Sequence, residues 1–178
     1  MAHSDSLRAV ICENLVDILN ADKNIRERAE KQLAMLETDE GILIHEQICT
    51  RLESVNVLNI RFLLEYGPHL MEISMSDNLD FSIRHLALVL LDRYITKHWT
   101  DMSEKFEIPE VSPSMKPLIR NFLLKAISIS LPNEVQSNSE LDVASKKLLS
   151  SLAHCLSKIA QYDWPLNWPE LFPALINY

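Results

Sequence analysis

Apolar residues recur along this chain at intervals of three and four, the spacing that lines one face of an α-helix. One such stripe runs from Leu7 to Ile18, and a second runs from Ile25 to Leu36 with charged residues around it. Between them Asn20-Ala21-Asp22 interrupts the pattern, and Asp22 is placed to cap the second helix. Because the connecting turn is so short, we expect the two helices to pack antiparallel.

The same spacing continues through the rest of the chain. It predicts further helices over residues 69–75, 79–99, 115–129 and 141–160. A short last helix is expected to start at Trp168-Pro169, with Pro169 near its first turn. We expect Gly67 to end a preceding helix at its C′ position and Pro68 to open the next one. Residues 37–66 keep helical spacing only in part, so this stretch is expected to be helical or irregular.

Glycine is scarce, with only Gly41 and Gly67 among 178 residues. Average usage would give about twelve. Tight hairpins and phosphate-binding loops both need several well-placed glycines. A β-rich fold and a nucleotide-binding enzyme of the usual kind are therefore disfavoured.

Helices arranged as successive antiparallel pairs are typical of an α-α superhelix. We therefore predict an all-α, HEAT-like solenoid of about three antiparallel helix pairs plus a partial fourth. The last segment ends in apolar residues instead of a polar capping unit: Leu171, Phe172, Leu175 and Ile176. On this basis we expect residues 1–178 to form the N-terminal array of a longer solenoid.

The chain is acidic, with 25 Asp and Glu against 17 Lys and Arg and a net charge of −8. This balance disfavours direct binding to nucleic acid or an anionic membrane and permits a basic protein partner. Three scattered cysteines offer no disulfide framework, and the first ten residues lack the apolar core of a secretory signal. The longest apolar run, Leu86–Leu91, is far too short for a membrane span. We expect a protein of the cytoplasm or nucleus.

Three stretches carry distinctive motifs. Residues 28–33 read Arg-Ala-Glu-Lys-Gln-Leu, residues 83–99 form a long amphipathic segment ending in His98-Trp99, and residues 159–171 hold two Trp-Pro steps. Together they resemble the N-terminal region of the importin-β (karyopherin) family. Ser103-Glu104-Lys105-Phe106 is most similar to the importin-nine branch. The residues that match the family motifs in structural positions are Ala29, Leu33, Trp99, Trp164, Pro165, Trp168 and Pro169.

The resemblance implies a nuclear import receptor without catalytic residues, cofactor or metal, whose importin N-terminal-type domain covers residues 29–129. It implies that the N-terminal repeats bind the small GTPase Ran in its GTP form, with the second helix of each pair lining the concave face. The importin-nine branch also implies basic cargo, such as core histones and ribosomal proteins, and shuttling between cytoplasm and nucleus through nuclear pores. Four charged residues on the expected second helices are candidate Ran contacts: Arg26, Glu30, Arg84 and Arg93.

Two features depart from the family pattern. Residues 37–66 make one inter-helix connection about twenty residues longer than is usual, and Asp92 stands where the family often carries Lys. Either departure could disturb Ran binding. The alternative function is therefore a HEAT-repeat interaction scaffold that no longer binds Ran.

Some side chains suggest other chemistry. His45 and Cys49 imitate the spacing of the HExxH metal motif, and an enzyme that uses them is a second alternative. No third ligand is evident, so an ordinary helical contact is the preferred interpretation. Because neighbours on a helix do not face each other, His154 and Cys155 are not expected to form a catalytic dyad. Cys155 is expected to be a buried thiol, and His85 and His98 are expected at the edges of an apolar face.

The stretch between residues 100 and 114 carries four acids: Asp101, Glu104, Glu107 and Glu110. We expect it to be a solvated loop, with contact to a basic cargo as the alternative. Trp99, Trp164 and Trp168 are expected to pack at helix ends and close the junctions between repeats, in preference to forming a recognition surface.

Overall fold

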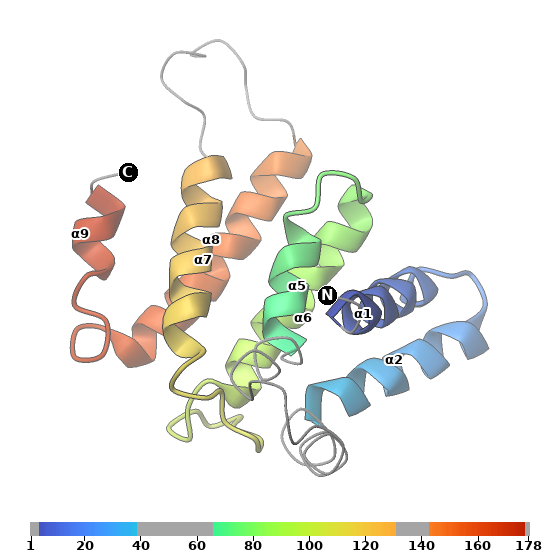
Figure 1. Ribbon diagram of the computed structural model, residues 1–178, viewed down its shortest axis with the longest axis horizontal. Coiled ribbons are helices and arrows are strands. Elements are labelled where there is room, and N and C mark those ends of the chain that lie inside the picture. The colour runs from blue at the N-terminus through green and yellow to red at the C-terminus, as the bar shows by residue number, and fades with distance from the viewer. Residues whose placement is uncertain (1–3, 39–65, 131–142, 177–178) are drawn as a thin grey trace, which may run out of the picture. The chain divides into compact units, whose positions relative to one another are not determined.

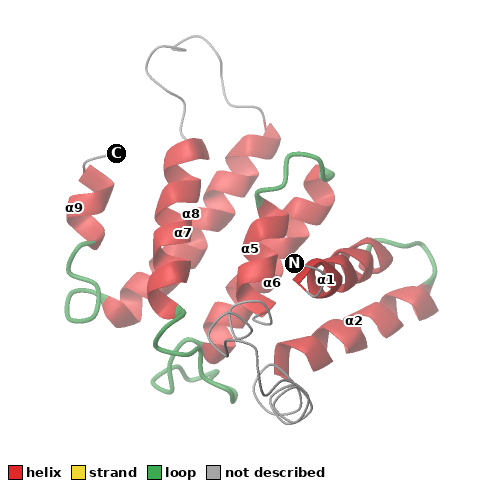
Figure 2. Ribbon diagram, viewed as in Figure 1, coloured by secondary structure: helices red, strands yellow, loops and turns green. Residues whose placement is uncertain are grey.

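The computed structural model describes residues 4–38, 66–130 and 143–176. Within these ranges every regular element is an α-helix, which confirms the predicted all-α class (Figure 2). The helices are α1 (Ser4–Ile18), α2 (Lys23–Thr38), α5 (Tyr66–Ser74), α6 (Phe81–His98), α7 (Lys116–Ser130), α8 (Val143–Asp163) and α9 (Leu171–Ile176). The expectation for residues 37–66 falls almost wholly outside the described residues, as do His45 and Cys49.

The chain divides into two compact units, Met1–Ile73 and Ser74–Tyr178, and each is described by itself. In the N-terminal unit, α1 and α2 pack against each other as a pair (Figure 1). Their facing stripes bury four apolar side chains: Ile11, Leu15, Ala29 and Leu33. These belong to the two apolar stripes of the sequence, so the first predicted helix pair is confirmed.

The turn between α1 and α2 is held by polar side chains. The backbone N–H of Asn24 donates to Asp22 Oδ1 at 2.8 Å, which makes Asp22 the N-cap of α2, as predicted. The Arg26 guanidinium donates to the carbonyls of Asn20 and Ala21 at 2.8 and 2.7 Å and satisfies backbone groups just beyond α1. The pair is therefore fixed at its tip by hydrogen bonds as well as by its apolar core.

Replacing the capping residue, Asp22→Ala, is expected to destabilise α2 by about 1 kcal/mol, because the Asn24 N–H loses its acceptor. Amide hydrogen exchange of the first turn of α2 measures this effect locally. The matched control is Glu27→Ala, which removes an exposed carboxylate from the same helix without touching the cap. Equal exchange rates in the two variants would contradict the capping role.

In the C-terminal unit, α8 packs against both α6 and α7. The core between them contains six side chains that are almost fully inaccessible to solvent: Leu88, Leu91, Ile119, Leu123, Leu152 and Ile159. In sequence order α6 and α8 are the second helices of successive pairs, and they lie side by side (Figure 1). This contact between second helices is the arrangement expected of a HEAT-like array.

Two sequence predictions about helix ends are wrong. Gly67 does not follow a helix as a C′ residue, because it lies inside the first turn of α5 and no described glycine has a positive φ. Tyr66 and Pro68 on either side of it are buried, so Gly67 sits within packed structure instead of in a turn. The last helix begins at Leu171, two residues later than Pro169.

The acidic linker, residues 100–114, is a loop with all four acids exposed, as predicted, and its backbone is bonded to α6. Backbone N–H groups of Glu107 and Val111 donate to the carbonyls of Lys97 and His98, both at 2.7 Å. The buried His98 ring contacts the carbonyls of Glu107 and Pro109 through Nδ1, at 2.8 and 2.9 Å. The linker therefore folds back onto the C-terminal end of α6 and extends its surface.

Candidate functional site

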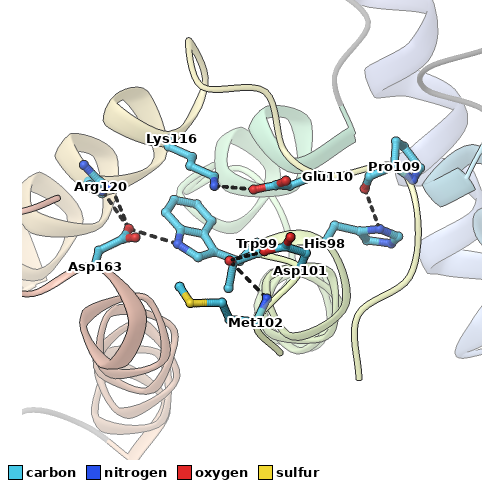
Figure 3. Close-up of polar contacts among 10 residues, drawn as sticks. His98, Trp99, Asp101, Met102, Pro109, Glu110, Lys116, Arg120 and Asp163 are labelled. Atoms are coloured by element: carbon cyan, nitrogen blue, oxygen red, sulfur yellow. Dashed lines mark hydrogen bonds and ion pairs between the residues drawn. The ribbon is translucent and has the colours of Figure 1, made fainter. Parts of the chain in front are cut away.

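A buried polar cluster joins α6, α7 and the C-terminal end of α8. We call Trp99, Arg120, Asp163 and Trp168 the tryptophan junction. The Trp99 indole is fully buried, and its Nε1–H donates to Asp163 Oδ2 at 2.9 Å. Arg120 donates to the same oxygen from Nε and Nη2, at 3.0 and 2.6 Å (Figure 3). Three donors thus converge on one buried carboxylate oxygen.

The Arg120 guanidinium also closes the junction by stacking. Its central carbon lies 5.8 Å from the Trp99 ring centroid and 5.4 Å from that of Trp168. Its Nη1 donates to the Asn167 carbonyl at 2.8 Å. Guanidinium groups favour such aromatic faces while making bidentate contacts in their own plane. Arg120 lies on α7. It therefore holds the loop after α8 against α7 and against Trp99 at the end of α6.

Lys116 adds a second cation to this cluster. Its Nζ lies 5.5 Å from the Trp99 ring centroid and forms an ion pair with Glu110 Oε1 at 2.7 Å (Figure 3). Glu110 is therefore engaged in holding the start of α7.

The doubled Trp-Pro motif has two different roles. Helix α8 ends at Asp163, whose carbonyl accepts from the N–H groups of Asn167 and Trp168 at 2.7 and 2.9 Å. Trp168 is buried in the junction. The Trp164 side chain is half exposed, and its ring meets that of Phe172 edge-on with 5.0 Å between the ring centroids. Burial of Trp99 and Trp168 agrees with packing at helix ends, and the exposed Trp164 departs from it.

Beside the junction, a hollow of about 530 Å³ opens over α6, the acidic linker and α8. We call it the charged hollow. Its lining residues are Asp92, Arg93, Thr96, Lys97, Glu104, Lys105, Phe106, Glu107 and Lys158. It is the candidate binding surface of the C-terminal unit.

The negative charge of Asp92 is balanced by a lysine on α8. Lys158 on α8 donates to Asp92 Oδ2 at 2.7 Å and to Thr96 Oγ1 at 2.6 Å. His154 Nε2 lies 3.7 Å from the other carboxylate oxygen. The departure from the family pattern at Asp92 therefore serves the contact between α6 and α8.

The four candidate Ran contacts are divided between the two units of the chain. Arg26 and Glu30 belong to α2 in the N-terminal unit, whereas Arg84 and Arg93 belong to α6 in the C-terminal unit. Arg26 is engaged by the α1–α2 turn. Arg84 donates to the Ser74 carbonyl at 3.0 Å and pairs with Asp77 at 3.2 Å, so it fixes the turn that precedes α6. Glu30 and Arg93 are exposed, and Arg93 lines the charged hollow.

Three important residues were missed in the sequence: Arg120, Asp163 and Lys158. Asp163 could have been identified from the sequence, because an acid directly before Trp164-Pro165 is well placed to accept hydrogen bonds from the N–H groups of the following turn. Arg120 and Lys158 had none, since their partners lie 43 and 66 residues away along the chain.

The other candidate groups have local packing roles. His85 stacks on Phe81 with 5.5 Å between ring centroids, and His98 packs on Tyr94 at 5.1 Å. In the described part of the chain, no three His, Cys, Asp or Glu side chains are grouped as a metal site requires. None of the described helices combines the length and the apolar character needed to cross a membrane.

Cys155 is buried between α6 and α8, and burial raises the pKa of its thiol to about 12. At pH 8 only about one such thiol in ten thousand is ionised, and the thiolate is the reactive form. We therefore expect folded protein to resist alkylation at Cys155 until it unfolds, with half-buried Cys12 as the internal comparison. Peptide-resolved mass spectrometry after iodoacetamide treatment measures both. Faster labelling of Cys155 than of Cys12 in folded protein would contradict its burial.

Comparison with known proteins adds a second kind of observation. Residues 57–128 match the model of the importin-beta N-terminal domain. Importin-9 of Drosophila melanogaster is 30% identical over 176 residues, which are 97% of this chain and 14% of that protein. Importin subunit beta-5 of Schizosaccharomyces pombe is 29% identical over 114 residues, 64% of this chain and 10% of that protein. Human importin-8 is 25% identical over 133 residues, 72% of this chain and 12% of that protein.

The chain therefore spans 10 to 14% of the length of these relatives. The match to importin-9 runs along nearly the whole chain, which confirms the resemblance to the importin-nine branch. The domain match, the relatives and the paired helices agree with one another, and together they place this chain in the importin-β family.

Proposed function

We propose that this chain is the N-terminal, Ran-GTP-binding module of a nuclear import receptor. The observation that carries the proposal is the importin-beta N-terminal domain match over residues 57–128. The contact between second helices α6 and α8 supports it, because a row of second helices forms a continuous surface for a protein partner. The proposed receptor shuttles between cytoplasm and nucleus through nuclear pores.

The proposed cargo is basic, with core histones and ribosomal proteins as examples. The net charge of −8 supports this class of cargo, because complementary charge speeds encounter and suppresses wrong partners. The receptor works by binding alone and needs no catalytic residue, metal or cofactor. When the GTP form of Ran occupies the array it lowers the affinity for cargo, and cargo lowers the affinity for Ran by the same factor.

We also propose domain boundaries wider than the matched range. The Arg28–Leu33 motif lies on α2, and Ala29 and Leu33 are buried in the first helix pair. An importin N-terminal-type domain over residues 29–129 would include this motif and the longer segment 37–66. Residues 1–178 would then form the N-terminal array of a longer solenoid.

The binding surface is tested by charge reversal at the two exposed candidates. Glu30→Lys and Arg93→Glu are each expected to weaken binding to Ran loaded with a non-hydrolysable GTP analogue by about two- to fivefold, as for loss of an exposed ion pair. Lys125→Glu on α7 is the matched control, since Lys125 is also exposed but lies on a first helix. Surface-immobilised chain and titrated Ran give the dissociation constants.

A folded chain that binds neither nucleotide form of Ran would favour the scaffold alternative. Unchanged affinity in both variants, with normal binding by the unaltered chain, would contradict only the choice of Glu30 and Arg93.

A further inference from the structure

The charged hollow has a charge balance opposite to that of the chain. Across the chain acids outnumber bases, 25 to 17. The hollow is lined by four cationic side chains, Arg93, Lys97, Lys105 and Lys158, and by three carboxylates, Asp92, Glu104 and Glu107. A concave surface with this excess attracts negative charge locally.

Two of the carboxylates hold lysines in place. Lys158 donates to Asp92 at 2.7 Å and to Thr96 Oγ1 at 2.6 Å, and Lys97 donates to Glu107 Oε2 at 2.8 Å. An ammonium group has three donors. Counting partners among the described residues, Lys158 therefore keeps one donor and Lys97 keeps two, on side chains that are only about 30% exposed. These pairs orient the cations while leaving hydrogen-bond donors for a ligand.

The acidic linker contributes two further side chains to the hollow, the cation of Lys105 and the aromatic ring of Phe106. Lys105 is exposed, and within the described residues it makes no ion pair or hydrogen bond through its ammonium group. Phe106 is partly exposed and supplies apolar surface beside it. A ligand for this site therefore needs several acceptor oxygens on a chain whose aliphatic parts can lie against Phe106.

We propose that the charged hollow binds an acidic segment of a partner protein. Asp and Glu side chains offer acceptor oxygens only, which matches the surplus of donors. A volume of about 530 Å³ accommodates a few side chains of an extended segment. The basic cargo proposed above has the opposite charge, so the hollow and the cargo surface are separate sites.

The test uses a fluorescein-labelled peptide of about ten residues with alternating Glu and Ser, long enough to cross the hollow. Anisotropy titration at low salt is expected to show binding that weakens as salt rises. Lys105→Glu should raise the dissociation constant by about three- to tenfold, since it removes one attraction and adds one repulsion. Lys125→Glu makes the same charge change outside the hollow and should alter the value by less than about twofold.

A second readout locates the peptide. Acetic anhydride acetylates accessible lysines, and mass spectrometry should show peptide-dependent protection of Lys97 and Lys105 but not of Lys125. The proposal is overturned if Lys105→Glu and Lys125→Glu weaken binding equally, or if the matched Lys/Ser peptide binds as well as the Glu/Ser peptide. No Ran is present in these experiments, so their failure leaves the proposed GTPase binding untouched.

Discussion

Asp163→Ala is expected to destabilise the C-terminal unit by about 3–5 kcal/mol, the largest effect expected of a single polar substitution among the described residues. The carboxylate is buried, and one of its oxygens accepts from Trp99 and twice from Arg120. Its removal leaves the largely buried guanidinium of Arg120 without its counter-ion. Breaking one half of a buried ion pair costs far more than the pair contributes as a whole.

Urea unfolding followed by tryptophan fluorescence measures this loss, because all three tryptophans lie in the C-terminal unit. Asp163→Asn keeps the shape and an acceptor oxygen but loses the charge, so its cost should fall between those of Asp163→Ala and the unaltered chain. Glu170→Ala removes a nearby exposed carboxylate and should change the free energy of unfolding by less than about 0.5 kcal/mol. Similar losses for Asp163→Ala and Glu170→Ala would contradict the role given to the junction.

Trp99→Ala is expected to cost about 3–5 kcal/mol for a different reason, the cavity left by a large side chain. The Trp99 side chain is fully buried and is covered by two cations, Lys116 and Arg120. Trp99→Phe keeps most of the ring but removes the Nε1–H donor to Asp163, so it should cost about 1–2 kcal/mol.

Trp164→Ala is the matched control for this substitution. The same residue type is removed, but its side chain is half exposed and its ring contact is with Phe172. We expect a loss well below half that of Trp99→Ala, measured by circular dichroism in urea because the fluorophore itself is altered. If the two alanine variants lost the same free energy, burial of Trp99 would not be the source of its effect.

The helices were predictable because their signal is local. The apolar stripes of α1, α2, α6 and α8 contain most of the side chains that these helices bury, and the Asp22 cap depends on a contact two residues away. Gly67 was misread because glycine is common both after helices and at close-packed positions, and sequence alone does not separate the two. In this chain the residues on either side of Gly67 are buried, so Gly67 occupies a close-packed position.

The polar contacts that build the junction and the hollow were not predictable in the same way. Asp163 meets Trp99 across 64 residues of chain, and Lys158 meets Asp92 across 66. Such pairings depend on which helices become neighbours, and periodicity carries no information about that. The acidic linker is a loop with exposed acids, as its composition predicts, but composition does not reveal its backbone hydrogen bonds to carbonyls at the end of α6.

The central proposal is that second helices of this array recognise the GTP form of Ran. Amide hydrogen exchange of the chain, measured alone and with Ran in each nucleotide state, tests it most directly. We predict slower exchange in peptides from α2 and α6 with the GTP form and no change with the GDP form. Equal protection by both forms, or protection confined to α1, α5 and α7, would contradict the account.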